Sequence, residues 1–572
     1  MVSLNQPIVE IKDVYYQYPG AKQPVLNGAN LNIEQGEFLA IIGGNGSGKS
    51  TICKTINGLI PHYFSGNYDG EVTVKGKSVK DQAVATLSHH VGYVYQDFQN
   101  QLMKLTVLED VSFSPLNFGY KDYKEKAQQA LELLGITHLQ DKTIWELSGG
   151  EKHLTALAGA LALNPEILIV DEPVAQLDPQ HATELYDKLK FLNDELGKTI
   201  ITIEHHTEFI ANYCKQIALI ENGKVMWHED VKKGLYNITK LQETHIYPPQ
   251  VTQAAMQLDS FASNDDMPIT VEEAVDYFKD YYFLPDSSRY KPNLQITNSA
   301  TVSVSNLQHE VKLLNKERRR VLDIDEIIVN EGDKIAIVGN NGAGKTTLMK
   351  SLAGIIKPKQ GEIMVNGIDV LKTPVEKLSS HISYIYQNPE EMFIQDTIEN
   401  DISFFGDVRN MNQDDLYEHI AESLNMKNLL PLDGRLLSGG QQRRSSVAIG
   451  LGMLPTVMML DEPTASLDIG NRKQLVDILH SIRDKVKTVL IATHDMQLVA
   501  EWATRVIVME HGKVIFDGTP KVLFDNVEIW KQAGLKLPQI AELSLALNIH
   551  PALSVDEFVG RIKEAQVNGF NG

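Results

Sequence analysis

Two copies of one short glycine-rich pattern constrain the fold of this chain more than any other part of its sequence. The pattern G-x-x-x-x-G-K-[ST] occurs as Gly43-Gly44-Asn45-Gly46-Ser47-Gly48-Lys49-Ser50 and again as Gly339-Asn340-Asn341-Gly342-Ala343-Gly344-Lys345-Thr346. In such a loop, backbone N–H groups face phosphate oxygens, the lysine reaches the β- and γ-phosphates, and the last hydroxyl can serve Mg²⁺. An ordinary glycine turn could explain one copy, but two copies in register predict two nucleotide-phosphate sites.

Several other segments recur after each loop, in the same order and at nearly the same distances. The recurring pairs are Gln96 and Gln387, Ser148 and Ser438, Asp171 and Asp461, and His205 and His494. A chain of 572 residues is also too long for a single hydrophobic core. We therefore predict a first domain at residues 1–285 with a C-terminal tail from about residue 231, a linker at 286–300, and a second domain at 301–572 with a tail from about residue 525.

Uninterrupted apolar runs lead into the repeated segments, as buried strands of a parallel sheet do. Phe38–Ile42 and Lys334–Val338 precede the loops, and Ile167–Val170 and Val457–Leu460 precede acidic segments. Residues 120–135 and 412–426 have helical spacing and few breakers. The sequence therefore predicts an α/β fold with two tandem P-loop nucleotide-binding domains, each with a helical insertion and a small C-terminal helical tail.

Composition and charge exclude several classes of function. The formal net charge of −21 repels nucleic-acid phosphate at long range, so we expect no nucleic-acid partner. The two cysteines, Cys53 and Cys214, are far apart, which argues against a disulfide framework or a cysteine-ligated metal cluster. The first residues lack the order of a signal peptide, and no uncharged apolar stretch approaches the roughly 18 residues that span a bilayer. We expect membrane contact only through partner proteins.

Paired carboxylates follow one apolar strand in each copy. Asp171-Glu172-Pro173 and Asp461-Glu462-Pro463 stand at the carboxyl end of their strands, where open α/β sheets bind ligands. Acidic pairs can also simply cap strand ends, but the phosphate loops favour a role in chemistry. We expect the aspartates to hold the Mg²⁺ shell and the glutamates to polarise the attacking water.

A second pair of segments stands before long helical stretches, at Leu147-Ser148-Gly149-Gly150-Glu151 and Leu437-Ser438-Gly439-Gly440-Gln441. Serine and glycine at a helix start present backbone N–H groups and the positive end of the helix dipole to an anion. The same residues would also serve as a plain helix cap. Local sequence is compatible with both interpretations.

Taken in order, the loop, glutamine, LSGG, acidic pair, Leu-Asp turn and histidine resemble the ATP-binding cassette (ABC) ATPases over essentially all of both halves. This resemblance implies ABC-type domains, ATP hydrolysis, ATP and Mg²⁺ as cofactors, and pairing of the two halves in cis. In that family the LSGG segment of one domain closes on the ATP held by the loop of the other. Leu177-Asp178 and Leu467-Asp468 match the family's Leu-Asp turn.

The resemblance, with the motifs above, gives a full set of site residues. The expected catalytic residues are Glu172, Glu462, His205 and His494. The expected metal ligands, partly through water, are Ser50, Gln96, Asp171, Thr346, Gln387 and Asp461. The expected nucleotide-binding residues are Tyr18, Gly43, Gly44, Asn45, Gly46, Ser47, Gly48, Lys49, Ser50, Thr51, Gln96, Ser148, Gly149, Gly150, Gly339, Asn340, Asn341, Gly342, Ala343, Gly344, Lys345, Thr346, Thr347, Gln387, Ser438, Gly439, Gly440 and Gln441.

Some segments narrow the resemblance further. Tyr386-Gln387-Asn388-Pro389-Glu390-Glu391-Met392-Phe393 is similar to the glutamine segment of the energy-coupling factor (ECF) importers of vitamins and metals, and Gln96–Leu102 is similar to it without the proline. The Pro-Gln tails at Pro249 and Pro538 point the same way. This implies an ATP-hydrolysing subunit of a micronutrient importer, peripheral on the cytoplasmic face of the cell membrane. Its partners would be a transmembrane coupling protein and a substrate-binding membrane component.

The two halves differ at positions that bear on nucleotide binding. Tyr18 matches the family's aromatic residue that stacks on adenine, whereas Val311 stands at the corresponding place in the second copy. Glu151 stands where Gln441 stands in the other LSGG segment and brings a negative charge. Because an aromatic stack is worth on the order of 1 kcal/mol, we expect the second loop's site to bind ATP several-fold more weakly.

Two other classes of tandem ATPase serve as alternatives. A tandem-ABC translation factor that acts on ribosomes would have a long charged helical linker and usually Asn-His before the Leu-Asp turn, which here reads Val174-Ala175-Gln176 and Thr464-Ala465-Ser466. A DNA-repair or chromosome-structuring ATPase would need a long coiled-coil insertion. The sequence favours the transport ATPase.

Overall fold

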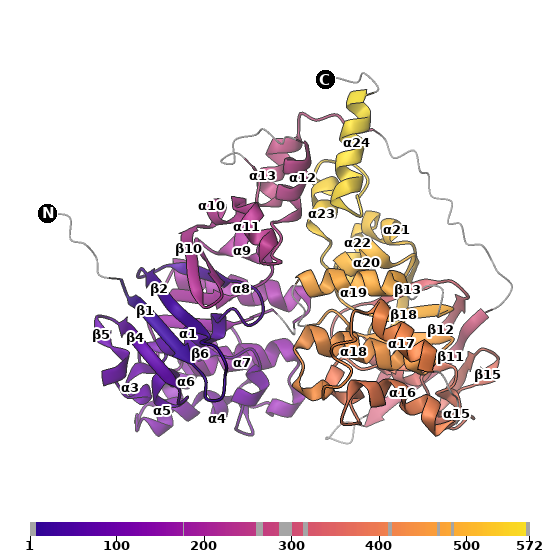
Figure 1. Ribbon diagram of the computed structural model, residues 1–572, viewed down its shortest axis with the longest axis horizontal. Helices are drawn as coiled ribbons and strands as arrows, with labels where there is room; N and C mark the ends of the chain where they lie inside the picture. Colours follow the sequence, from indigo (N-terminus) through magenta and orange to yellow (C-terminus); the bar gives the residue numbers. More distant parts are fainter. Residues whose placement is uncertain are drawn as a thin grey trace. The chain divides into compact units, whose positions relative to one another are not determined.

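The computed structural model describes residues 7–174, 177–258, 267–284, 300–312, 318–409, 414–465, 469–481 and 486–567. Contacts between Cα atoms divide the chain into two units, Met1–Tyr277 (unit 1) and Phe278–Gly572 (unit 2). They are the indigo-to-magenta and pink-to-yellow parts of Figure 1. The predicted linker at 286–300 lies almost wholly outside the described residues, so the domain boundary at 285 stays a prediction.

Each unit contains a four-stranded antiparallel sheet and a six-stranded, mostly parallel sheet. The strand orders are β2-β1-β4-β5 and β10-β9-β3-β8-β7-β6 in unit 1, and β12-β11-β14-β15 and β16-β17-β18-β13-β19-β20 in unit 2. In both larger sheets only the last hairpin is antiparallel. The predicted α/β fold with two tandem P-loop domains is confirmed.

The elements of unit 1 follow the expected order along the chain. Its strands are β1 (Val9–Gln17), β2 (Leu26–Ile33), β3 (Phe38–Ile42), β4 (Asn67–Val74), β5 (Lys77–Ser78), β6 (Val91–Val94), β7 (Ile167–Asp171), β8 (Thr199–Ile203), β9 (Gln216–Glu221) and β10 (Lys224–Asp230). Its helices are α1 (Lys49–Ile56), α2 (Leu59–His62), α3 (Val84–Leu87), α4 (Val107–Val111), α5 (Phe113–Asn117), α6 (Tyr123–Leu134), α7 (Gly149–Leu161), α8 (Pro179–Asp194), α9 (Thr207–Tyr213), α10 (Val231–Tyr236), α11 (Ile238–Glu243), α12 (Gln250–Leu258) and α13 (Val271–Phe278).

Unit 2 repeats this order. Its strands are β11 (Ala300–Lys312), β12 (Arg318–Asn330), β13 (Lys334–Val338), β14 (Gln360–Val365), β15 (Ile368–Asp369), β16 (Ile382–Ile385), β17 (Val457–Asp461), β18 (Thr488–Ala492), β19 (Arg505–Glu510) and β20 (Lys513–Gly518). Its helices are α14 (Lys345–Leu352), α15 (Val375–Leu378), α16 (Ile398–Val408), α17 (Asp414–Ser423), α18 (Gly439–Gly452), α19 (Ile469–Ser481), α20 (Met496–Trp502), α21 (Pro520–Asp525), α22 (Val527–Gln532), α23 (Gln539–Ala546) and α24 (Val555–Val567).

The apolar runs are explained by burial on both faces of the larger sheets. In β17, Val457 and Met459 belong to the core beneath the antiparallel sheet, whereas Met458 and Leu460 belong to the core under the helical insertion. Alternate residues of a strand point to opposite faces, so a strand covered on both sides needs apolar residues throughout. The insertions predicted at 120–135 and 412–426 appear as α6 and α17, apart from residues 412 and 413, which the structure does not describe.

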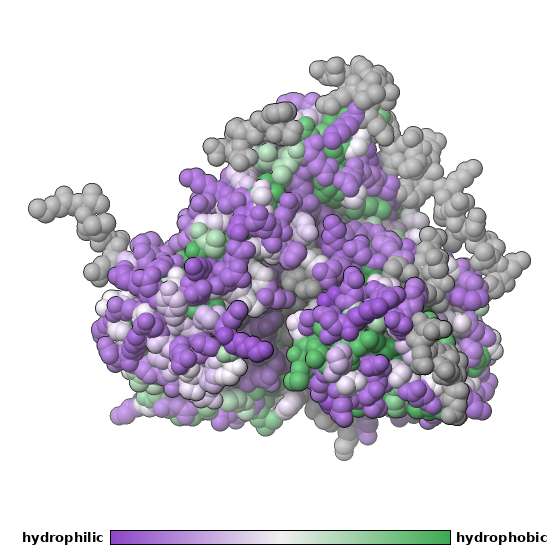
Figure 2. Space-filling view, viewed as in Figure 1, coloured by the Kyte–Doolittle hydropathy of each residue, from purple (hydrophilic) through white to green (hydrophobic). Residues whose placement is uncertain are grey.

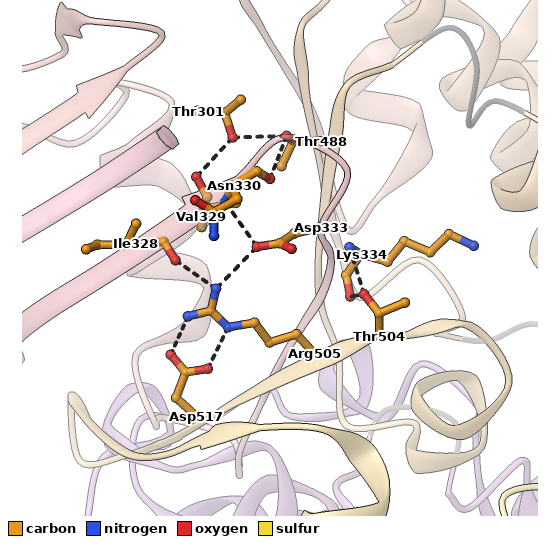
Figure 3. Close-up of polar contacts among 10 residues, drawn as sticks. All are labelled: Thr301, Ile328, Val329, Asn330, Asp333, Lys334, Thr488, Thr504, Arg505 and Asp517. Carbon is orange, nitrogen blue, oxygen red and sulfur yellow. Dashed lines mark hydrogen bonds and ion pairs between the residues drawn. The ribbon is translucent and has the colours of Figure 1, made fainter. Parts of the chain in front are cut away.

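A polar network lies at the end of the unit 2 sheet where strands β13 and β19 begin (Figure 3). The phosphate loop follows the opposite end of β13. Arg505, at the start of β19, pairs with both carboxylate oxygens of Asp517 at 2.7 and 2.6 Å. Its Nη1 also donates to Ile328 O at 2.8 Å and to Asp333 Oδ2 at 3.2 Å. The guanidinium therefore joins three strand ends and the turn before β13.

Replacing Arg505 by alanine should lower the stability of unit 2 by about 2 kcal/mol, because two carboxylates then lose a mostly buried partner. This corresponds to a fall of about 4–8 °C in the denaturation midpoint, measured by calorimetry. Arg320, which forms an exposed ion pair with Asp323 at 3.4 Å, provides a matched control. Arg320→Ala should change stability by less than about 1 kcal/mol, and an equal loss in both variants would contradict the assignment.

Candidate functional site

Both glycine-rich loops connect a central strand to a helix, as predicted. The first loop joins β3 to α1, and the second joins β13 to α14. Gly43 and Gly339 have φ of 150°, and a Cβ at either position would lie 2.2 Å from the backbone oxygen of Ile220 or Met509. Glycine is therefore required there because the neighbouring strand leaves no room for a side chain.

The loop lysines are buried against their own loops. Lys49 Nζ donates to Gly43 O at 2.8 Å and to Gly44 O at 3.0 Å. Lys345 Nζ donates to Gly339 O at 2.6 Å and lies 3.5 Å from Glu462 Oε1. Each ammonium is thus held at the centre of its loop, where a phosphate could replace the carbonyl oxygens as its partner.

The aspartates at the ends of β7 and β17 lie beside the loops. In unit 2, Thr346 Oγ1 donates to Asp461 Oδ1 at 3.1 Å. Burial raises the pKa of Asp171, helped by the charge of Glu172, while hydrogen bonds from Ser50 and Tyr93 oppose the rise. Burial likewise raises the pKa of Asp461. A nearby cation would favour the charged form of each carboxylate.

These residues fit Mg²⁺. Oδ1 of Asp171 is buried and has no hydrogen-bond partner among the residues that the structure describes. Nowhere among the described residues do three or more His, Cys, Asp or Glu side chains form a group that could hold a metal ion. One carboxylate with a neighbouring hydroxyl is typical of Mg²⁺, which takes its remaining ligands from water and substrate phosphates.

Two tyrosines that the sequence analysis missed hold these aspartates. Tyr93 in β6 donates its hydroxyl to Asp171 Oδ2 at 3.1 Å, and Tyr384 in β16 donates to Asp461 Oδ2 at 2.7 Å. Both belong to a repeated Tyr-x-Tyr-Gln pattern that ends at Gln96 and Gln387. That repeat was a usable signal, since it places the tyrosines on the strand next to the acidic one.

Both glutamates after the aspartates have a left-handed backbone, with φ of 49° at Glu172 and 43° at Glu462. Their N–H groups donate to Ile203 O at 3.0 Å and to Ala492 O at 2.8 Å, which ties the turn to the next strand. A non-glycine residue in this region is uncommon and is maintained by its surroundings. The sheet edge therefore fixes the direction of each glutamate side chain.

Each glutamate contacts the predicted histidine of its own unit. His205 Nε2 lies 3.2 Å from Glu172 Oε1, and His494 Nδ1 lies 2.9 Å from Glu462 Oε2. Burial alone would raise the pKa of each carboxyl, but the histidines, with the loop lysines, lower it below its usual range. Gln96 Nε2 also donates to Glu172 Oε2 at 2.5 Å. Both carboxylates are thus held charged, as acceptors for a water proton must be.

The LSGG segments cap α7 and α18. Ser148 N donates to Glu151 Oε2 at 2.8 Å, and Ser438 N donates to Gln441 Oε1 at 3.1 Å. The cap interpretation is therefore correct for both, and the anion-binding interpretation stays a prediction. Lys142 Nζ lies 3.2 Å from Glu151 Oε1, so the additional negative charge at this position has a partner.

The Leu-Asp turn of unit 1 packs against its own LSGG segment. Asp178 is fully buried and caps α8 by accepting from His181 N at 3.1 Å. A Cβ on Gly150 would lie 2.4 Å from the His181 ring, which explains the glycine at that position. The matching turn, Leu467-Asp468, lies outside the described residues.

Strand register supports the comparison of Tyr18 with Val311. Tyr16 pairs with Leu26 in unit 1, and His309 pairs with Leu322 in unit 2. The hydroxyl of Tyr18 lies 3.4 Å from Thr51 Oγ1, directly after the loop. Val311 is 37% exposed at the equivalent place.

A family model described as ABC transporter matches residues 26–175 and 322–465, half of the chain. A protein of Caldanaerobacter subterraneus described as an ABC transporter ATP-binding protein is 32% identical over 98% of this chain and 100% of its own length. A similarly described protein of Methanosarcina acetivorans is 31% identical over 95% of this chain and 91% of its own. An archaeal ribosome recycling factor, solved with a ribosomal stalk protein, has a TM-score of 0.55 at 20% identity over 91% of this chain and 92% of its own, which shows a shared fold.

None of the described helices is long and apolar enough to cross a membrane. The family model covers both loops, both aspartates and both glutamates, so each unit carries one ABC cassette. This chain belongs to the ABC transporter family, as an ATP-binding protein and ATPase with two cassettes in one polypeptide.

Proposed function

We propose that this ATPase is the energy-coupling subunit of an ECF-type importer for a vitamin or metal micronutrient. The observation that carries the proposal is an apolar pocket of about 260 Å³ in unit 2, one wall of which is the segment that follows Gln387. Tyr386, Met392 and Ile394 from that segment face Phe404 and Phe405 of α16 there. Hydrophobic surface is visible over the helical part of unit 2 in Figure 2.

An exposed apolar pocket beside a polar catalytic centre suits an apolar segment of another protein. Such a partner, a transmembrane coupling protein, would press on the same segment that carries Gln387. Movement in the membrane could then change the site, and the state of the site could change the partner. A separate membrane component would select the cargo.

The residues of each cassette provide the parts of ATP hydrolysis. Lys49 and Lys345 would bind the β- and γ-phosphates together with the loop N–H groups. Ser50 with Asp171, and Thr346 with Asp461, would hold Mg²⁺, which neutralises charge that develops on the phosphates. Gln96 and Gln387 would add to the Mg²⁺ coordination through bound water.

The attacking water would lie between a glutamate and the γ-phosphate. Glu172 or Glu462 would polarise it, and His205 or His494 would keep that carboxylate charged and contact the γ-phosphate. The helix starts at Ser148 and Ser438 would complete the sites in trans, Ser438–Gln441 on the nucleotide of Lys49 and Ser148–Gly150 on that of Lys345. Both segments start a helix, α7 and α18, and the positive end of a helix dipole attracts anions, which supports this role. Closure on ATP and reopening after hydrolysis would then drive the partner.

Purification of the native protein from membranes tests this proposal. We expect integral membrane proteins and a bound micronutrient to co-purify with it. Phe404→Glu should lower that co-purification by about tenfold, because it buries a charge in the apolar contact. Val522→Glu, at an exposed position of α21, provides the control and should co-purify normally. Association with ribosomes and with no membrane protein would replace the importer by the translation-factor alternative.

A further inference from the structure

In unit 2, one buried arginine joins the LSGG helix to the glutamine segment. Arg443 lies in the second turn of α18 and is 3% exposed. Its Nη1 donates to Tyr386 O at 2.9 Å, and its Nη2 donates to Gln387 O at 2.6 Å. Burial lowers the pKa of Arg443 to about 10, so it remains charged at neutral pH. The two bonds are charge-assisted and diverge from one rigid group, which fixes direction as well as distance.

The arginine lies where three parts of the cassette meet. Its helix begins with the LSGG segment after Ser438, and Ile449 of this helix and Met453, which caps its C-terminal end, line the apolar pocket. The segment that it holds carries Gln387 on one side and Met392, in the pocket wall, on the other. A displacement of either pocket wall would therefore be transmitted through Arg443 to the backbone of Gln387.

Unit 1 has a different arrangement at the corresponding position. His153, five residues after Ser148, is 2% exposed and stacks on Phe98 with ring centroids 4.3 Å apart. Burial lowers its pKa to about 3, and neither ring nitrogen has a hydrogen-bond partner in the described parts of the chain. At the position that corresponds to Arg443, α7 thus contacts its glutamine segment through a ring stack.

The glutamine segment of unit 1 is braced from within instead. Gln101 Oε1 accepts from Tyr95 N at 3.0 Å, and Gln101 Nε2 donates to Tyr93 O at 2.8 Å. Met392 stands at the place of Gln101 in unit 2 and has no amide group to do this. The two cassettes therefore fix the same catalytic segment by different means.

We propose that Arg443 is a positioning residue for hydrolysis at the second cassette, which ties Gln387 to helix α18 so that the two move as one body. In the first cassette the corresponding contact is the stack of His153 on Phe98, which does not bond to the backbone of the glutamine segment. The inference rests on the proposed role of Gln387 and of the two glutamates. It assigns a mechanical difference between the two ATP sites in addition to the difference at Tyr18 and Val311.

The test uses the full chain with one site silenced at a time. In a Glu172→Gln background, where the second cassette alone hydrolyses ATP, Arg443→Ala should lower kcat by about tenfold or more, because Gln387 is misplaced. The KM for ATP should change by less than about threefold, because the phosphate loop is untouched. Arg443→Lys, which keeps a charged donor, should recover part of the rate.

Two comparisons separate positioning from a structural effect. In a Glu462→Gln background, where the first cassette alone works, Arg443→Ala should lower kcat by less than about twofold. His153→Phe keeps the stack on Phe98 and removes only the two unpartnered ring nitrogens. In the same Glu462→Gln background it should also change kcat by less than about twofold. An unchanged kcat in the Glu172→Gln background, or an equal loss in both backgrounds, would overturn the proposal.

If Arg443→Ala shows no cooperative thermal unfolding, Arg443→Gln replaces it, because a neutral amide can still donate to one carbonyl. Its kcat in the Glu172→Gln background should lie between that of the parent and that of a chain with both glutamates replaced, and a parental kcat would again overturn the proposal. A separate measurement shows whether the assignment of Glu172 and Glu462 as catalytic residues has failed. If a chain with both Glu172→Gln and Glu462→Gln still hydrolyses ATP, the glutamates are not the catalytic residues, whatever Arg443 does.

Discussion

A chain in which Glu172 and Glu462 are both replaced by glutamine is expected to hydrolyse ATP at least about 100-fold more slowly, with ATP still bound. Each glutamate directly follows a strand of the larger sheet, and its carboxylate contacts a histidine of the same unit. Glutamine keeps the size of the side chain but cannot accept a proton from water. An assay of released phosphate measures the rate of hydrolysis, and equilibrium dialysis with ATP and Mg²⁺ measures the affinity for ATP.

The single variants provide the internal control for this expectation. Glu172→Gln and Glu462→Gln should each retain a measurable fraction of the rate, because the other cassette keeps its own glutamate, aspartate and loop. Asp194→Asn, which removes an exposed carboxylate that pairs with Lys215, should leave the rate unchanged. Hydrolysis by the double variant at more than about a tenth of the normal rate would mean that another group activates the water.

Loss of either loop lysine should remove ATP binding at that site alone, and the two losses should be unequal. Each ammonium is buried at the centre of its loop, so alanine leaves phosphate without its main cationic partner. We expect the affinity of the altered site to fall by about 100-fold, which corresponds to about 3 kcal/mol. Isothermal titration with ATP in each variant then reports the site that remains.

Lys345→Ala leaves the site with Tyr18, and Lys49→Ala leaves the site with Val311. The first variant should bind ATP about fivefold more tightly than the second, because an aromatic stack contributes on the order of 1 kcal/mol. Tyr18→Ala added to Lys345→Ala should remove the difference. Equal affinities in the two lysine variants would show that the aromatic residue does not set the order of the sites.

The structure changes one reason for expecting the second site to bind ATP more weakly. Glu151 was expected to add repulsion near the second nucleotide, but its carboxylate caps α7 and is paired with Lys142 at 3.2 Å. A paired and partly screened charge acts weakly at a distance. Any inequality between the sites therefore has to come mainly from Tyr18 and Val311 and from the way each glutamine segment is held.

The sequence by itself determined which residues stand at each strand end and helix start. These features depend on neighbours in the chain: the loop needs glycines at Gly43 and Gly339, buried strands need uninterrupted apolar runs, and helix starts need a serine cap. Because each signal lies within about ten residues, and because it occurs twice in register, the two cassettes could be predicted from spacing.

Only the tertiary structure decided which distant side chains hold those residues in place. Tyr384 is 77 positions from Asp461, and Arg443 is 56 from Gln387, so no local pattern joins them. The same position carries Arg443 in one cassette and His153 in the other, and their neighbours alone show that one tethers a backbone while the other stacks on Phe98. Such contacts depend on how strands and helices pack, and packing brings residues together regardless of their separation in the chain.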